Sequence, residues 1–267
     1  MDRQALLAAY DHELRVAIEP PGMRKEALPQ LVRLVRPAPG MSSIRYSRLD
    51  PAQIDAAIQE QIAYFAPARQ PFEWSVYEHD QPPDLADRLV AAGFAPDDPT
   101  AVMALDLRHA PATLLAPTSA ELRPIVERDQ LGAVLDVMEQ VWGGQFGWIT
   151  QRMGDHLLIP GYLSIYVAYV DERPACAGWV YFHPGSQFAS LYGGSTLPQH
   201  RGRGLYTAVL ARRAQEAIAR GYRYLTIDAG PMSRPIVASH GFELLTTVRS
   251  FEWQGYSDGQ SAEPSRQ

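Results

Sequence analysis

The sequence predicts an α/β protein of two domains. Three observations carry this prediction: the length of the chain, the alternation of helical and strand patterns in its second half, and a fainter copy of that order in its first half. A chain of 267 residues is longer than one typical small domain and suits two. A hydrophobic content of 46% is ordinary for a globular protein and supplies a core.

Strand and helix patterns alternate regularly in the second half of the chain. Turn residues and apolar runs predict strands over 121–127, 162–170, 174–182, 186–197, 222–228 and 242–253, the last as one strand or a strand pair. Helical patterns lie over 130–142, 147–158, 205–220 and, in a shorter form, 233–239. Asp129 is expected to cap the first of these helices, and Gly221 to end the third.

The helix predicted over 205–220 has two contrasting sides. Its apolar stripe consists of Leu210, Ala214, Ala217 and Ile218. Charged residues spaced by four lie opposite, at Arg212, Glu216 and Arg220. We therefore expect the stripe to pack on the sheet and the charged side to form ion pairs in solvent.

The first half repeats this order faintly. A strand candidate over 72–78 precedes a helical stretch that ends in Gly93-Phe94, much as the strand over 222–228 precedes one that ends in Gly241-Phe242. A helix over 51–65 takes the place of the helix over 205–220, but the loop before it, "SRLDPAQ", contains no glycine. Residues 1–15 also have a helical pattern, and residues 108–124, with their prolines and small residues, suit a linker between the halves.

Composition excludes several classes of protein. A net charge of -6 argues against a general nucleic-acid binder, and no apolar stretch approaches the length of a membrane span. The first residues lack the apolar core of a signal peptide, so we expect a cytoplasmic protein. Residues 255–267 are polar and small, which predicts a disordered tail.

The chain offers no disulfide and no metal site. Its single cysteine, Cys176, lies in an apolar strand-like run and is expected to be a buried structural thiol. No His, Cys, Asp or Glu cluster has the spacing of metal ligands, so we expect no metal.

The segment "QHRGRG", residues 199–204, has the ingredients of a phosphate-binding loop. A strand pattern precedes it, Gly202 and Gly204 lie inside it, and a helix pattern starts near Leu205. Glycines let backbone N–H groups approach an anion, and the unpaired N–H groups and dipole of a helix start favour negative charge. Arg201 and Arg203 add positive charge that suits phosphate.

Two well-known phosphate-binding motifs do not match this loop. A dinucleotide-binding fingerprint requires glycine or alanine where Thr207 stands, and a Walker loop requires a Gly-Lys-Ser/Thr sequence that is absent. An ordinary arginine-rich turn would explain the loop by itself. The strand before it and the helix after it favour anion binding.

The loop resembles the Q/R-x-x-G-x-G/A signature of the GNAT superfamily of N-acetyltransferases. The resemblance covers about residues 120–254 and includes the strand over 222–228, the short helix and the "HGF" before the last strand. It implies an α/β (α+β) fold of two GNAT-like domains, each a mixed, mostly antiparallel central sheet flanked by helices. The first, residues 1–115, would be a degenerate domain, and the second, residues 120–254, would bind acetyl-coenzyme A.

The resemblance also implies a function. Acetyl-coenzyme A would be the co-substrate, and a primary amine of a small molecule or peptide would attack its thioester directly. The strand before the loop would splay from its neighbour, and the backbone amide around Leu197 would polarise the thioester carbonyl. The residues implied in coenzyme binding are Leu197, Gln199, His200, Arg201, Gly202, Arg203, Gly204, Leu205 and Tyr206.

The usual catalytic residues of the family are missing. Val237 stands where many members have a tyrosine acid, and neither the asparagine of the preceding strand nor the glutamate of the splayed strand is present. Substitutes are Asp228 as a base acting through water, Ser233 as a donor near the sulfur, and Tyr192 in the acceptor cleft. Each has a structural alternative: a turn cap for Asp228, a helix N-cap for Ser233 and packing for Tyr192. His183 and His240 are expected to be surface or hydrogen-bonded residues.

Several questions stay open from the sequence. A coenzyme-binding sensor or scaffold without catalysis is one alternative to the proposed enzyme. An enzyme that uses a different acyl donor or a thiol-precursor amine, as in mycothiol synthesis, is a second alternative. The sequence also leaves self-association open. The aromatic segment with Trp142, Phe146, Trp148 and Met153 either lines an apolar acceptor pocket or closes the core between helices and sheet.

Overall fold

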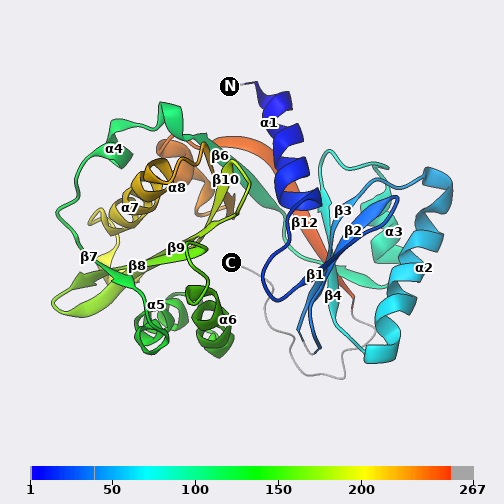
Figure 1. Cartoon of the computed structure of the whole chain (residues 1–267), viewed down its shortest axis with the longest axis horizontal. Helices are drawn as coiled ribbons and strands as arrows, with labels where there is room; N and C mark the ends of the chain where they lie inside the picture. Colours follow the sequence, from blue (N-terminus) through cyan, green and yellow to red (C-terminus); the bar gives the residue numbers. More distant parts are fainter. Residues whose placement is uncertain (1, 39, 254–267) are drawn as a thin grey trace. The chain divides into compact units, whose positions relative to one another are not determined.

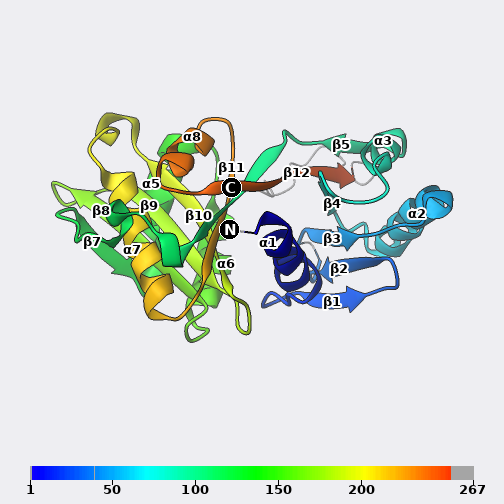
Figure 2. The ribbon, with the colours of Figure 1, turned by 90° about the horizontal axis from the view of Figure 1, so that it is seen from above.

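The computed structural model describes residues 2–38 and 40–253, and packing divides them into two compact units whose elements can be followed in Figures 1 and 2. The first unit runs to Val102 and resumes at Leu244, and the second runs from Met103 to Glu243. The chain therefore passes from one unit to the other twice. That residues 1–115 and 120–254 form separate domains stays a prediction, and the tail expected over 255–267 lies outside the described residues.

The first unit is a mixed sheet of order β1-β2-β3-β4-β12, in which β5 pairs with β12. The β3–β4 pair is parallel, and the other pairs are antiparallel. Its strands are β1 (Arg24–Ala27), β2 (Leu31–Val35), β3 (Ser42–Ser47), β4 (Phe72–Tyr77), β5 (Phe94–Pro96) and β12 (Glu243–Trp253). Its helices are α1 (Arg3–Tyr10), the π-helical turn η1 (Asp11–Val16), α2 (Ile54–Phe65) with the turns η2 (Pro51–Gln53) and η3 (Ala66–Ala68), and α3 (Leu85–Ala91).

The core of the first unit is built by α2 against the sheet. Ile54, Ile58 and Phe65 share the buried face of α2, as the helical period predicts, and Phe65 stacks on Phe72 with ring centroids 4.5 Å apart. Trp74 is fully buried in the same cluster, and its Nε1 donates to the Ser47 hydroxyl at 3.1 Å. The large apolar side chains of β4 thus fix α2 on the sheet.

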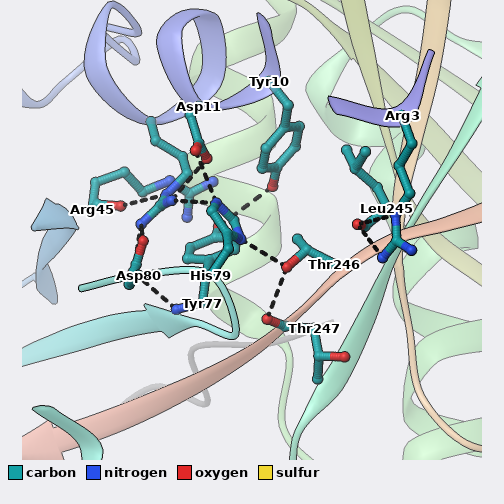
Figure 3. Close-up of polar contacts among 11 residues, drawn as sticks. Arg3, Tyr10, Asp11, Arg45, Tyr77, His79, Asp80, Leu245, Thr246 and Thr247 are labelled. Atoms are coloured by element: carbon teal, nitrogen blue, oxygen red, sulfur yellow. Dashed lines mark hydrogen bonds and ion pairs between the residues drawn. The ribbon is translucent and has the colours of Figure 1, made fainter. Parts of the chain in front are cut away.

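A buried polar network lies under α1 and η1 in the first unit (Figure 3). Arg15, fully shielded from solvent, donates through Nη2 to both carboxylate oxygens of Asp80 at 2.7 and 2.8 Å and through Nη1 to Asp11 at 2.8 Å. His79 contacts Asp11 through Nε2 at 2.8 Å and the Thr246 hydroxyl through Nδ1 at 2.9 Å. The network thereby ties η1 to the end of β4 and to β12.

The second unit is a sheet of order β6-β11-β10-β9-β8-β7. The β10–β11 pair is parallel, whereas β7, β8, β9 and β10 pair antiparallel in sequence order. Its strands are β6 (Thr100–Asp106), β7 (Glu121–Ile125), β8 (Leu163–Val170), β9 (Arg173–Phe182), β10 (Phe188–Thr196) and β11 (Tyr224–Ala229). Its helices are α4 (Ala112–Leu115), α5 (Gly132–Trp142), α6 (Gly147–Leu157), α7 (Leu205–Ala219) and α8 (Arg234–Ser239), with the 3-10 turns η4 (Leu107–His109), η5 (Arg128–Leu131) and η6 (Pro198–His200).

Helices cover both faces of the sheet of the second unit (Figure 1). α7 packs on one face, where Val209 and Leu205 meet Cys176 and Tyr166. α5 and α6 pack on the other, in a larger cluster around Trp179. In both units a helix connects the two parallel strands, α2 between β3 and β4 and α7 between β10 and β11, so the repeated order expected from the sequence is present in the fold.

The predicted fold class is confirmed, and several local predictions need correction. Asp129 does not cap α5, whose N-cap residue is Leu131; the capping box of Glu127 and Gln130 belongs to the preceding turn η5. Ile218 is 39% exposed and lies outside the buried stripe of α7. Within residues 108–124, α4 packs on α7 with Leu114 fully buried, and that these residues link two domains stays a prediction. Residues 243–253 form one strand.

Candidate active site

The segment "QHRGRG" forms an exposed turn between β10 and α7. Gly202 has φ +73° and Gly204 has φ +76°, a left-handed conformation that L side chains adopt only at a cost. A Cβ at either glycine would meet nothing within 4 Å. The glycines therefore serve the backbone conformation and leave open space above it.

The first turn of α7 has no side-chain cap. Gly204 is the N-cap residue and has no side chain to accept from the first amides, so these N–H groups and the positive end of the helix dipole face the turn. The corresponding position in the first unit is the start of the turn η2, which leads directly into α2; Gln53, the N-cap residue of α2 itself, makes no side-chain cap. At the start of η2 the Asp50 carboxylate accepts from Ala52 N at 2.9 Å, and Pro51, which has no N–H, opens the turn. A carboxylate of the chain thus caps the turn that leads into α2, whereas no side chain caps the turn that leads into α7.

Side chains of the loop are partly engaged with one another. Arg201 donates through Nε to the Thr196 carbonyl at 3.3 Å, and Arg203 Nη1 lies 3.1 Å from His200 Nδ1. Leu205 is buried against the sheet. Tyr206 reaches under β10, where a Cβ on Gly194 would lie 2.7 Å from its ring. Gln199 is exposed. The loop thus presents backbone amides and two exposed arginines, with its apolar residues turned inward.

The parallel ladder between β10 and β11 stops early. It runs from the Phe188–Tyr224 pair to the Leu191–Ile227 pair, although β10 continues to Thr196 and β11 to Ala229. The strands therefore separate just before the loop. The next residues along the two strands are Tyr192, half-buried, and Asp228, exposed, so each of these two predicted catalytic residues directly follows the last pair of the ladder.

A β-bulge lies in β10 at the same point. The register with β9 shifts between Tyr192 and Ser195, and Gly193 has φ +66°. A Cβ on Gly193 would lie 1.8 Å from the Trp179 ring, so only glycine fits. Within the described residues, the ladders give Gly193 no partner on β9 or on β11.

The amide of Leu197 is engaged in this structure. It donates to the Ala175 carbonyl on β9 at 2.9 Å, and the side chain is buried. Gly193 lies four residues upstream on the same strand. Neither the ladder with β9 nor the ladder with β11 pairs it, so neither ladder gives its amide a partner.

The remaining candidates have mixed surroundings. Ser233 is the N-cap residue of α8, but its hydroxyl donates to the Gly230 carbonyl at 3.3 Å and not to the helix. Val237 is fully buried. His240 lies with Nε2 3.2 Å from the Thr207 hydroxyl, and burial lowers its pKa, which favours a neutral ring. His183 is buried, 2.9 Å from the Ser190 hydroxyl.

The aromatic segment divides between core and surface. Phe146 and Met153 belong to the cluster under α5 and α6, as the core interpretation expects, with Trp148 packed against it. Trp142 is 41% exposed, and its Nε1 donates to the Ser195 hydroxyl at 2.9 Å, just beyond the bulge. Trp142 therefore links α5 to the splayed strand.

Sequence reasoning missed Arg213. It lies on the buried face of α7, between Val209 and Ala217 at helical spacing, and is fully shielded from solvent. Its Nη1 donates to the Trp179 and Tyr192 carbonyls, both at 3.1 Å. The available signal was a charged residue inside an otherwise apolar stripe.

Cys176 is fully buried, and burial raises the pKa of its thiol to about 11, as expected for a structural cysteine.

Across residues 2–38 and 40–253, no three His, Cys, Asp or Glu residues are grouped so as to hold a metal ion. None of the helices in that part of the chain is long and apolar enough to cross a bilayer.

No protein-family profile and no curated protein sequence matches the chain. Solved structures do. A GCN5-related N-acetyltransferase from Kribbella flavida aligns with a TM-score of 0.71 and 16% identity over 95% of this chain and 96% of its own. A functionally unknown conserved protein from Staphylococcus epidermidis aligns with a TM-score of 0.66 and 12% identity over 89% of this chain and 96% of its own.

These similarities define the class of fold: the chain has the fold of the GNAT acetyltransferases. A tandem GNAT protein from the clavulanic acid biosynthesis pathway is similar along 94% of this chain and 93% of its own, with 16% identity and a TM-score of 0.60. The fold expected from the loop and its flanking elements is thus present.

Proposed function

We propose that the chain is an acetyl-coenzyme A-dependent N-acetyltransferase that transfers acetyl to a primary amine of a small molecule or peptide. One observation carries the proposal: the uncapped start of α7, with Gly202 and Gly204, adjoins the opening between β10 and β11. Amides at the helix start would bind the pyrophosphate, and Arg201 and Arg203 would add charge. The unpaired edges of the opening would hold the pantetheine arm.

The reaction follows from this placement. The amine nitrogen attacks the thioester carbon, and the carbonyl electrons move to oxygen, where the Gly193 amide would stabilise them in place of Leu197. The C–S bond then breaks, and the thiolate leaves with the electron pair. Asp228, exposed directly after the last paired residue of β11, would accept the amine proton through water.

A pair of glycine variants tests coenzyme binding. Gly202→Asp combined with Gly204→Asp should weaken acetyl-coenzyme A binding by at least about 100-fold, because the carboxylates fill the open space and repel phosphate. Gly185→Asp is the matched control, since Gly185 also has positive φ and open space but lies between β9 and β10. Calorimetry measures the affinity of the double variant and of the control for acetyl-coenzyme A. Unchanged affinity in the double variant would refute the loop assignment.

The base is tested separately. Asp228→Asn should lower kcat/KM by about 100-fold and flatten its rise with pH, because a general base contributes roughly that factor. Ser233→Ala is the comparison, since the Ser233 hydroxyl is bonded to the backbone. If Asp228→Asn retains the activity and pH profile of the unaltered protein, Asp228 is not the base.

A coenzyme-binding sensor without catalysis remains the second candidate, and the buried Val237 in place of a tyrosine acid favours it. Thiol release with a panel of amines, corrected for hydrolysis, distinguishes the two. Tight acetyl-coenzyme A binding with no transfer to any amine identifies the sensor. Mass spectrometry of the donor bound from a cell extract tests whether another acyl group is used.

A further inference from the structure

Arg213 is a buried cation with no carboxylate partner among the described residues. Its Nε donates to the Val209 carbonyl at 3.2 Å and its Nη1 to the carbonyls of Trp179 and Tyr192. Within residues 2–38 and 40–253, the buried Nη2 has no hydrogen-bond partner. An arginine remains protonated, and burying its charge costs several kcal/mol unless an anion compensates it. Arg213 is therefore an expensive choice for a packing position.

The neighbouring residues make room for this guanidinium. Gly178 on β9 lies directly beside it, where an added Cβ would be 3.0 Å from Arg213 Cζ. The register of β10 against β9 shifts between Tyr192 and Ser195, beside this guanidinium. Arg213 Nη1 thus joins one carbonyl from each of the two strands at the bulge.

The carbonyl of Tyr192 belongs to the same peptide unit as the amide of Gly193. In a planar trans peptide the C=O and N–H bonds point in opposite directions. The Arg213 guanidinium binds this C=O, so the Gly193 N–H points away from Arg213. The parallel ladder with β11 ends at the Leu191–Ile227 pair and gives the Gly193 N–H no partner.

We infer that Arg213 polarises the Tyr192–Gly193 peptide and so strengthens the Gly193 amide as a donor to the thioester oxygen. A cationic donor at one end of a peptide group increases the dipole of that group, and hydrogen bonds in series strengthen one another in a low dielectric. The inference rests on the proposed function. Arg213 acts as a positioning residue: when the amine attacks, the electron pair that leaves the C=O bond is stabilised by Gly193, and Arg213 supports Gly193 from behind.

The probe is acetyl-coenzyme A labelled with ¹³C at the carbonyl. Bound to the unaltered protein, its carbonyl stretch in difference infrared spectra should lie below its frequency in water. Arg213→Met should reduce this shift and lower kcat by about tenfold, a fraction of the effect of removing an oxyanion donor. Affinity for coenzyme A without the acetyl group should stay within about twofold, since its phosphate contacts are untouched.

Three further variants complete the test. Arg213→Lys should recover part of the shift because it restores the charge, and Arg212→Met, at the exposed neighbouring position, should leave it unchanged. Arg213→Gln replaces Arg213→Met if the latter does not fold. A full carbonyl shift in the neutral variant, or an equal loss of affinity for coenzyme A and acetyl-coenzyme A, would overturn the inference. Failure of the unaltered protein to bind acetyl-coenzyme A would instead overturn the proposed function.

Discussion

Arg15 in the first unit and Arg213 in the second are both fully shielded from solvent, yet only Arg15 faces carboxylates among the described residues. Asp80 and Asp11 neutralise Arg15, and the Tyr77 ring lies 3.7 Å from its Cζ. Arg213 has only backbone carbonyls as acceptors in the same part of the chain. The first arrangement joins three elements of a fold, whereas the second directs a charge without a carboxylate partner at backbone carbonyls, the Tyr192 carbonyl among them.

The turns that lead into the two connecting helices, α2 and α7, also differ in whether a carboxylate of the chain binds their positive groups. In the first unit, Asp50 occupies the amides before α2, and in the second unit Gly204 leaves those of α7 open. Internal anions therefore satisfy positive groups in the first unit, and in the second unit comparable groups remain available. We therefore expect an anionic ligand to bind at the start of α7 and not at the turn before α2.

The largest effect is expected from removing Arg15. Arg15→Met leaves the buried Asp80 and the half-buried Asp11 without their cation, which should cost about 3–5 kcal/mol of unfolding free energy. Arg213→Met leaves no carboxylate behind and should cost less. Hydrogen exchange, followed peptide by peptide, measures the loss in each unit.

The control for Arg15 is Arg88→Met, because Arg88 is 46% exposed in its ion pairs with Asp55 and Asp84. It should change stability by no more than about 1 kcal/mol. Equal losses in Arg15→Met and Arg213→Met would break the comparison between the two buried arginines.

Gly193→Ala tests the bulge that supplies Arg213 with its carbonyls. The left-handed φ should cost about 1–2 kcal/mol and the overlap with Trp179 a further ~1–3 kcal/mol. Gly202→Ala has the same sign of φ but open space, so only the first cost applies. Thermal unfolding of the two variants gives the difference, and similar values for both would show that Trp179 moves aside easily.

Acid should affect the Arg15 network more than the surroundings of Arg213. Burial tends to raise the pKa of Asp11, but its hydrogen bond with His79 and the charge of Arg15 outweigh burial and lower that pKa below 3.8. Asp11 therefore contributes stability above about pH 4, and this contribution is lost as the pH falls through the lowered pKa.

Asp11→Asn should remove this acid dependence, whereas Arg213→Met should leave it in place. Urea unfolding between about pH 3 and pH 6 measures the slopes. An unchanged slope in Asp11→Asn would mean that other carboxylates dominate the acid response of the first unit.

The smallest effect concerns Cys176, whose surroundings include Arg213. The charge of Arg213 tends to lower the thiol pKa, but burial prevails and raises it to about 11. The folded protein should therefore resist maleimide at about pH 8, with or without Arg213, and react fully in denaturant. Rapid labelling of the folded protein would show that the α7 face of the sheet opens.

Local patterns predicted most elements of the second unit because its helices and strands follow their own periodicities. The role of Gly202 and Gly204 could be predicted from the sequence because a positive φ and an open helix start both favour glycine. Asp129 was misassigned because aspartate and the preceding glutamate, Glu127, are both plausible caps, and only the backbone decides between them.

Long-range features were beyond local patterns. The role of Arg213 depends on Gly178 and on the bulge in β10, which come together only in the sheet. Ile218 fits an apolar stripe by spacing, but the folded chain leaves its side chain 39% exposed. The assignment of β12 to the sheet of the first unit is set by pairing across more than half the chain.

That pairing has a consequence for synthesis on the ribosome. β5 pairs with β12, and β4 receives its second neighbour from the same strand, so the sheet of the first unit waits for residues 243–253. At about 5–20 residues per second, several seconds separate the emergence of β5 from that of β12. During this time β4 exposes an unpaired edge, which is a site for association with other chains. The unit that is translated first is therefore completed last.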